Sequence, residues 1–397
     1  MPHPTDPYEG DDLDDLPPPQ PVHYAEQALL GALLLEPHRL DTIGHLEPHH
    51  FGNHAHNALF TAIRTVSSPD PKQHVKDTAW LGAVLAKARH EAPGLTASYL
   101  HTLIQSCPRP QHATAYAGMI RADHARRTLR EHADRLCQTA TDTTLPSPAT
   151  TVLAQADALS RYLDELTTHF AAHPGSLPRT PASPPPPRQT GEEALDEEHL
   201  LLATATAHPD DLHLMRWLQP EDFALPLHGQ LYRCLTALAR RGDAVDPVTV
   251  LWEAQHQQLL TAQVTPADLM ALVSDPVGLP DYWGERILRR ALLGQAHAVG
   301  LRLGVLTDDQ ANTIHQLITG SRRALAGLSA VRSRWQHATS PTPESQPSRT
   351  KSSAAPRAGP PRTTAPPPPT ARLTRLTANP PVAGPLGPAT GRKSTSW

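Results

Sequence analysis

The chain has few of the residues that cross-link, anchor or export a protein. Its three cysteines, Cys107, Cys137 and Cys234, are far apart and form no CxxC pair, so neither a disulfide framework nor a cysteine zinc site is indicated. The longest apolar run, residues 28–35, contains a glycine and is too short to span a bilayer. The start of the chain is acidic and proline-rich, unlike a signal peptide. We therefore expect a reduced, cytoplasmic protein without membrane contact.

Motifs for catalysis are missing as well. The sequence contains no G-x-S-x-G elbow and no H-E-x-x-H pair. Residues 387–394 come nearest to a phosphate-binding loop, but their spacing is wrong and Arg392 stands where the lysine is needed. Pro385 and Pro388 lie in or beside this string, which a strand–loop–helix unit does not tolerate. We predict that the chain is not an enzyme and binds no cofactor.

Proline is abundant and unevenly placed. Of the 44 prolines, most lie in the three stretches 1–21, 174–190 and 338–397, which cannot form regular helix or central strand and have too little apolar content to fold. This predicts five regions: an acidic disordered segment 1–21, a helical domain 22–170, a Pro-rich linker 171–191, a second helical domain 192–336 and a Pro/Arg-rich disordered tail 337–397.

Charge is divided among these regions. The net charge is −4, with acids gathered in 1–21 and basic residues in the tail, which leaves the body mildly acidic. Direct duplex binding by the body is poorly supported, because phosphate neutralisation needs a basic face. The tail could make weak nucleic-acid contacts. The alternative is a solvated Pro/Arg linker, which is the usual explanation of a run of charged residues.

A repeat is the most informative pattern in the chain. Residues 26–60 align without a gap to residues 198–232, at a constant offset of 172. The identical pairs are Glu26/Glu198, Leu29/Leu201, Leu30/Leu202, Pro37/Pro209, Leu40/Leu212, Leu46/Leu218, Pro48/Pro220, Phe51/Phe223, His56/His228 and Leu59/Leu231. Most are apolar or helix-breaking positions, the kinds that fix a fold. A duplicated scaffold without a catalytic motif favours an interaction protein.

The repeated blocks have the periodicity of helices. Leu29, Leu30, Leu33 and Leu34 lie on one helix face, and Pro37 ends that helix. In the first block we expect further helices at 40–46, 54–66, 75–90, 96–107, 111–142 and 149–166. In the second we expect helices at 194–206, 209–217, 227–241, 247–261, 265–274, 281–306 and 308–334. No alternating pattern indicates strands. The predicted fold is all-α, with two tandem helical bundles that each end in a long helical hairpin.

Several of these residues resemble a known family. The string A-E-Q-A-L-L-G-A-L-L-L at 25–35, the spacing of Leu46, Pro48, Phe51 and His56, and the long helix that follows Tyr116 resemble the N-terminal domain of DnaB-type replicative helicases. The second block resembles it through Glu198, W-L-Q-P-E-D-F at 217–223, His228 and V-D-P-V-T-V-L at 245–251. Its opening at 196–205 has lost the family's glycine.

The resemblance implies a role in DNA replication. In the helicases this domain is a helical collar that pairs through its hairpins, helps to assemble the ring and docks primase or loader proteins, while a separate ATPase domain is the motor. The leading hypothesis is therefore a non-catalytic interaction protein that binds a replicative helicase, a primase or its own copies. The alternatives are a DNA-binding accessory protein that uses the basic tail and the arginines of the hairpins, and a helicase-family protein whose ATPase is supplied in trans. Oligomeric state, and pairing of the two copies within one chain, stay open.

Two sets of residues are candidates for function. Arginines of the long helices could bind a partner, or they could form a solvated face with i,i+4 partners such as Arg127–Glu131 and Arg130–Asp134. The candidates are Arg121, Arg126, Arg127 and Arg130 in the first copy and Arg286, Arg289 and Arg290 in the second.

Histidines are dense near the start of the third predicted helix, at positions 49, 50, 54 and 56. Two histidines one turn apart can chelate a metal, but only His56 recurs in the second copy, as His228. We therefore predict a helix cap or a buried hydrogen-bonding residue at this position, and no metal site.

Overall fold

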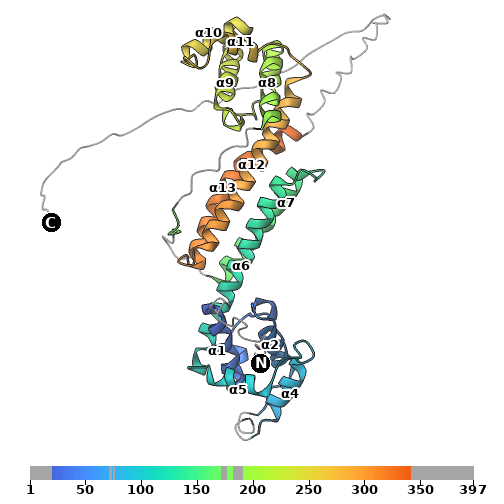
Figure 1. The fold of residues 1–397 in the computed structure, drawn as a ribbon, viewed down its shortest axis with the longest axis vertical. Helices are drawn as coiled ribbons and strands as arrows, with labels where there is room; N and C mark the ends of the chain where they lie inside the picture. Colours follow the sequence, from blue (N-terminus) through green and yellow to red (C-terminus); the bar gives the residue numbers. More distant parts are fainter. Residues whose placement is uncertain (1–19, 71–73, 75–76, 171–176, 182–190, 341–397) are drawn as a thin grey trace, which may run out of the picture. The chain divides into compact units, whose positions relative to one another are not determined.

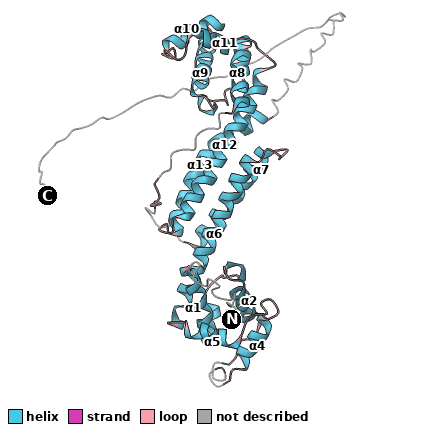
Figure 2. Cartoon of the chain, viewed as in Figure 1, coloured by secondary structure: helices cyan, strands magenta, loops and turns pink. Residues whose placement is uncertain are grey.

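The computed structural model describes residues 20–70, 74, 77–170, 177–181 and 191–340. These residues form helices, and no strand occurs among them, which confirms the all-α prediction (Figure 2). All of them belong to one compact unit, Met1–Pro341. The disorder predicted for residues 1–19, for 171–176 and 182–190 of the linker, and for 341–397 of the tail lies outside the described residues.

The first copy is a cluster of short helices followed by a long hairpin (Figure 1). Its elements are α1 (Pro21–Leu35), the 3₁₀ helices η2 (Pro37–Thr42) and η3 (Pro48–His50), α2 (His54–Thr65), α4 (Ala79–Ala88), α5 (Ala97–Gln105), η4 (Pro110–His112), α6 (Ala113–Thr141) and α7 (Pro148–His169). Phe51 is buried beside Phe60, with ring centroids 4.9 Å apart. The first turns of α6 complete this core through Ala117 and Ile120, so the hairpin is continuous with the cluster. We call the cluster of short helices before α6 the first head.

The second copy repeats this order. Its elements are α8 (Glu192–Ala207), the 3₁₀ helices η5 (Pro209–His213) and η6 (Pro220–Asp222), α9 (Pro226–Arg241), α10 (Pro247–His256), α11 (Pro266–Leu272), α12 (Pro280–Asp308) and α13 (Ile314–Thr339). Phe223 and Tyr232 take the places of Phe51 and Phe60, with ring centroids 5.2 Å apart. Proline opens most of these elements because its missing N–H and fixed φ suit a first helical turn. The cluster before α12 is the second head.

Some helices differ from the predicted ones in their limits or type, for local reasons. The predicted helix 247–261 stops at His256, and Gln258 adopts φ +60°, a left-handed conformation that a helix cannot contain. The last helix begins at Ile314 rather than at 308, because Thr313 and Gln316 form a capping box at its start. The short helices predicted at 40–46 and 209–217 are 3₁₀ turns.

Gly31 explains one difference between the copies. A Cβ atom at this position would lie 2.1 Å from the carbonyl oxygen of Leu103, so only glycine lets α5 pack directly on α1. The corresponding residue of the second copy is Ala203, which is buried in α8. The loss of the family's glycine therefore removes the space for an equally close helix contact.

The two hairpins form one four-helix bundle within the chain (Figure 1). Buried side chains of α6, α7, α12 and α13 share a single core, which includes Leu129, Leu159, Leu303 and Leu317. This answers the question of intrachain pairing that the sequence left open. Each hairpin alone would expose an apolar face, and the other copy covers it.

The central helices α6 and α12 run antiparallel and cross at small residues. Arg126 of α6 contacts Thr307 near the end of α12. Further along α6, the Sγ atom of Cys137 lies 3.8 Å from the carbonyl oxygen of His297, which comes earlier in α12. A Cβ atom at Gly300 would lie 2.8 Å from the carbonyl oxygen of Ala133 and 2.5 Å from Cys137 Sγ. The two backbones can approach this closely only because position 300 has no side chain.

Part of the predicted linker is held against the second hairpin. The amide of Arg179 donates to Asn312 Oδ1 at 3.0 Å, and the Thr180 hydroxyl donates to Asp309 Oδ2 at 2.7 Å. Gln316 Nε2 donates to the carbonyl oxygen of Leu177 at 2.8 Å. Residues 177–181, which we expected to be disordered with the rest of 171–191, are therefore bound to the turn between α12 and α13.

The glycine at the crossing gives a stability test. Gly300→Ala should lower the free energy of unfolding by about 1–3 kcal/mol, because the added methyl group meets a backbone carbonyl that cannot rotate away. Gly294→Ala, on the same helix with open space around its Cβ, should instead raise it by about 1 kcal/mol through helix propensity. Urea denaturation followed by circular dichroism measures both. Equal stabilisation by the two alanines would show that the helices do not cross at Gly300.

Candidate functional site

A glutamate–histidine pair that occurs in both copies is almost completely buried. The pairs are Glu26–His56 and Glu198–His228, and the exposed fractions of these four residues are 1, 0, 0 and 4%. The Oε2 atom of the carboxylate lies 2.6 Å from Nδ1 of His56 in the first copy and 2.9 Å from Nδ1 of His228 in the second. Glu26 of α1 binds His56 of α2, and Glu198 of α8 binds His228 of α9, so each pair joins two helices of its copy.

In the first copy the pair extends to a tyrosine. Glu26 Oε1 accepts the amide hydrogen of Gly52 at 2.6 Å, and His56 Nε2 lies 2.7 Å from the Tyr99 hydroxyl. Burial raises the pKa of Tyr99. The carboxylate of Glu26 can only accept, so His56 donates its Nδ1–H to Glu26, and its Nε2 forms the second hydrogen bond, with the Tyr99 hydroxyl. The prediction of a buried hydrogen-bonding histidine is confirmed, whereas the cap of α2 is Asn53, which accepts from the amides of residues 55 and 56.

In the second copy an arginine replaces the tyrosine. Glu198 Oε1 accepts from the amide of Ala224 at 2.5 Å and from Arg290 at 2.9 Å, and Oε2 accepts from the amide of Leu225 at 3.3 Å. Burial opposes ionisation of Glu198, but the hydrogen bonds from His228 and Ala224 and the charge of Arg290 outweigh it and hold its pKa below the ordinary value. The sequence repeat contains both pairs, but only the fold shows that their members bind each other.

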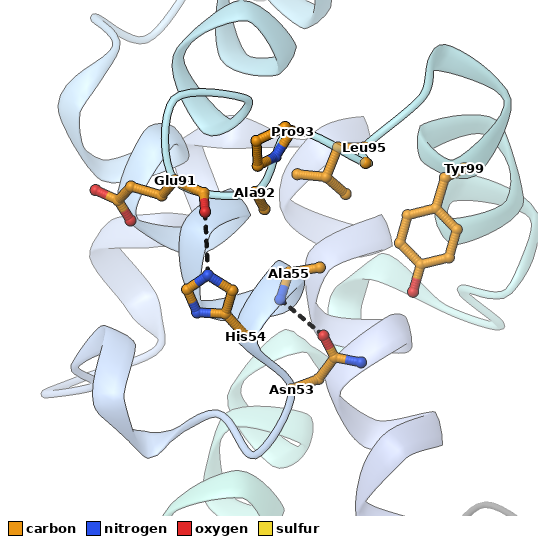
Figure 3. A pocket seen from close by; sticks show the side chains of 9 residues that line it. Asn53, His54, Ala55, Glu91, Ala92, Pro93, Leu95 and Tyr99 are labelled. Atoms are coloured by element: carbon orange, nitrogen blue, oxygen red, sulfur yellow. Dashed lines mark hydrogen bonds between the residues drawn. The ribbon is translucent and has the colours of Figure 1, made fainter.

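A shallow hollow lies beside the Tyr99 ring (Figure 3). It has a volume of about 620 Å³ and lies between the start of α2 and the loop that joins α4 to α5. His54 Nε2 is 3.0 Å from the carbonyl oxygen of Glu91, and Asn53 Oδ1 accepts the amide hydrogen of Ala55 at 2.8 Å. The first bond joins the two rims, the second caps the start of α2 within one rim, and the floor between the rims is apolar, with Leu95 and Ala92. The hollow is an open depression rather than an enclosed site.

Two of the predicted partner-binding arginines lie between the hairpins. Arg126 donates to the carbonyl oxygens of Thr307 at 2.8 Å and Asp309 at 3.0 Å, and it also binds the carbonyl of Asn312. These carbonyls end α12, where backbone acceptors lack helical partners and the helix dipole is negative. Arg130 pairs with Asp134, the i,i+4 contact that the sequence suggested, and with Asp308 of the other hairpin. Both arginines therefore fasten the bundle.

Two others join the first head to its own hairpin. Arg121 donates to the carbonyl oxygens of Ile43 at 2.8 Å and His45 at 3.3 Å. Arg127 pairs with Asp123 at 2.8 Å, rather than with Glu131, and donates to the carbonyl oxygen of His50 at 2.6 Å.

The remaining three lie on α12. Arg286 and Arg290 both bind Glu197 of α8, and Arg286 also pairs with Glu193 at 3.0 Å. Arg289 is exposed and forms no hydrogen bond or ion pair with a described residue. Six of the seven arginines thus have intramolecular partners, and Arg289 is the one that this conformation leaves open to another molecule. Partner binding by these arginines stays a prediction.

A family model matches each of the two copies. Residues 18–122 and residues 191–283 match the model described as the DnaB-like helicase N-terminal domain. The chain belongs to this family and carries its domain twice. A search of curated proteins and a search of solved structures gave no significant match. Both matched segments end in the first turns of a long helix, so the DnaB-type match covers the heads, and the paired hairpins lie beyond it.

The histidines of the first DnaB-type domain separate into two groups. His54 and His56 make the bonds described above, with Glu91 and Glu26. His49 and His50 instead lie against His124 of α6, with ring centroids 5.2 and 4.4 Å from it. Sequence spacing grouped the four neighbours of one segment, and nothing in the spacing pointed to His124. As for membranes, no helix in the described part of the chain is both long and apolar enough to cross one.

The buried carboxylate of the second domain gives a pH-dependent prediction. Because the pKa of Glu198 is lowered in the folded protein, its contribution is fully present above the unfolded value of about 4.3 and is lost as the pH falls through the folded value. Glu198→Gln should therefore cost about 1–3 kcal/mol at pH 7 and progressively less below pH ~4. Denaturant unfolding at several pH values measures this.

Glu221→Gln is the matched control, because Glu221 is exposed and forms only a surface pair with Arg233 at 3.5 Å. It should change the unfolding free energy by less than about 0.5 kcal/mol at every pH. A Glu198→Gln effect that stays constant between pH 7 and pH 3 would contradict the assigned ionisation.

Proposed function

We propose that the chain is a non-catalytic interaction protein of DNA replication, which offers two collar-type domains already paired within one chain to a replicative helicase or a primase. The observation that carries the proposal is the shared core of the two hairpins. The resemblance to the helicases implies that such a hairpin is a pairing element, and here each hairpin has its partner in the same chain. The proposal also rests on family membership in both copies.

Internal pairing determines where a partner can bind. The apolar faces of the hairpins are buried in the bundle, and its polar contacts occupy Arg126 and Arg130. A second copy of the chain would have to break these contacts to pair through the same faces. We therefore place the partner surface on the heads and on the outer faces of the long helices.

Exposed apolar side chains favour the second head and its hairpin. In the first copy they are Tyr24, Leu35 and Met119, and in the second they are Leu214, Val248, Trp252, Val277, Leu279, Tyr282, Leu301 and Val305. Tyr282 is 54% exposed and lies two turns before Arg289, on the same side of α12. Tyrosine and arginine often dominate the energy of protein interfaces. We name Tyr282 and Arg289 the α12 patch and propose it as a partner contact.

The DNA-binding alternative has less support from the described residues. Its hairpin arginines are largely engaged inside the chain, so few are left to neutralise phosphates. Its other element, the basic tail, lies outside the described residues. An ATPase supplied in trans needs the same docking surfaces as the leading proposal, and a helicase bound to this chain would serve both.

Internal pairing predicts the mass of the chain in solution. Light scattering during size-exclusion chromatography should give the mass of a single chain at micromolar concentration, because each hairpin is already covered. A stable hexamer would contradict hairpins satisfied within one chain.

The partner is tested by pull-down with the helicase and the primase of the same host. We expect one of them to bind, and Tyr282→Ser with Arg289→Ala to weaken binding at least tenfold, as expected for loss of interface hot spots. Tyr24→Ser with Arg135→Ala, an exposed pair of the same types in the first copy, is the control and should bind as wild type. Lack of binding to both proteins would refute the proposed function, whereas binding unaffected by the double variant would refute only the α12 patch.

A further inference from the structure

A compact group of three imidazoles lies where the first head meets its hairpin. His49 and His50 come from η3 and His124 comes from α6. The ring centroids are 4.5 Å apart for 49 and 50, 5.2 Å for 49 and 124, and 4.4 Å for 50 and 124. One ring nitrogen from each residue lies within 4.8 Å of the other two. We call this group the imidazole triad.

Backbone and arginine contacts hold His50 in place. Pro48 opens η3, and the amide of Glu47 donates to Nδ1 of His50 at 3.2 Å. Arg127, one turn after His124, donates to the carbonyl oxygen of His50 at 2.6 Å and so ties η3 to α6. His49 is exposed, which leaves its ring free to rotate and leaves the triad open to solvent.

The environment opposes protonation of two of the three rings, His50 and His124. Burial, followed by the nearby His124 and His49, lowers the pKa of His50 to about 3. Burial, Arg127 and His49 lower the pKa of His124 to about 4. A neutral imidazole has one free lone pair, which is the form that binds a metal ion.

The triad also contains an unused polar atom. Nδ1 of His124 is buried and has no hydrogen-bond partner among the described residues, and Nε2 has only the Thr128 hydroxyl at 3.5 Å. Buried polar atoms normally have hydrogen-bond partners, so a buried nitrogen without one needs an explanation, such as a ligand that binds it. The positive charge of Arg127 is compensated by Asp123 at 2.8 Å, and it therefore presents a modest barrier to a cation.

A second group of possible ligands, His23, Glu26 and His56, lacks these properties. Both nitrogens of His56 and both oxygens of Glu26 are engaged in hydrogen bonds of 2.6–2.7 Å. A metal there would have to displace three good bonds. The contrast separates a fully satisfied hydrogen-bond network from a group of rings in which Nδ1 of His124 has no partner among the described residues.

The second copy has an acidic residue at the position that corresponds to His50. Asp222 stands where the first copy has His50, and it forms an ion pair with Arg334 of α13 and accepts the amide hydrogen of Gln219 at 2.8 Å. The second head is thus fastened to its hairpin by opposite charges at this point. In the first copy the three rings form no such ion pair with one another, and a shared cation would add an electrostatic link between η3 and α6.

We propose that His49, His50 and His124 bind one Zn²⁺ ion, which fastens η3 to α6. Three imidazole nitrogens with a water as the fourth ligand make a usual tetrahedral zinc site, and imidazole is a good ligand for zinc among the divalent ions. At zinc–nitrogen distances of about 2.0–2.1 Å the nitrogens must come to about 3.3 Å from one another. Rotation of His49 and a small movement of the other rings achieve this.

Binding changes the hydrogen bonding of His50. In the neutral ring, Nδ1 accepts from Glu47, so Nε2 carries the proton. Coordination through Nε2 moves that proton to Nδ1 and gives up the 3.2 Å bond, whereas coordination through Nδ1 replaces the bond directly. In both cases one long hydrogen bond is exchanged for a metal bond.

The test is a zinc titration of the full-length chain after removal of metal with a chelator. Competition against a chromophoric chelator should show one Zn²⁺ per chain with submicromolar affinity. His49→Ala, at an exposed position that cannot disturb the core, and His124→Ala should each weaken this binding at least tenfold. His101→Ala, an exposed histidine of α5 outside the triad, should bind as wild type. Zinc should raise the melting temperature of wild type and of His101→Ala, and not of the other two.

Three results would overturn the site. The first is wild-type protein that binds no zinc more tightly than micromolar. The second is His49→Ala and His124→Ala variants, both folded by circular dichroism, that bind one ion as tightly as wild type; this would mean adventitious binding by others of the 24 histidines. The third is loss of the tight ion in His23→Ala but not in His49→Ala, which would move the site to the buried glutamate–histidine network.

Discussion

The structure depends on the burial of two hairpin faces against each other. A two-helix hairpin has an apolar stripe that it cannot cover alone, and in this chain the second copy covers it. The contact is close because Gly300 lets α12 lie on the backbone of α6 near Ala133. Arg126 then satisfies the carbonyl groups at the end of α12, so the same interface also completes a helix terminus. The duplication therefore produces one structural unit rather than two independent domains.

Within each head, one buried carboxylate organises the connection between helices. Glu26 and Glu198 accept backbone amides of the segments before α2 and α9 and bind the histidines of these helices. The copies differ in how they complete this network, with Tyr99 in one and Arg290 in the other. They differ again at the joint with the hairpin, where Asp222 forms an ion pair and His50 stacks on other imidazoles. The second domain has an ion pair at the point where the first has a group of imidazole rings.

Helices and their order were predictable because their causes are local. Leucine periodicity and the opening prolines set most boundaries, and caps such as Thr313 with Gln316 explain the corrected one. The pairing of Glu26 with His56 was predictable only in part, since the repeat marks both residues but not their contact. Residues 177–181 were expected to be disordered because they belong to a proline-rich segment. Composition could not show that a few hydrogen bonds to the turn between α12 and α13 hold them. The partners of the arginines were unpredictable, because Arg126 and Thr307 meet only when the hairpins do.

The sequence by itself determined the all-α class, the duplication and the family, since these follow from periodicity, identical positions and short motifs that each segment contains. The tertiary structure decided what the two copies do with each other. Hairpin pairing, the engagement of Arg126 and Arg130, and the meeting of His124 with His49 and His50 all join residues far apart in the chain. Such contacts depend on which faces are left to bury after the local elements have formed, and no single segment carries that information.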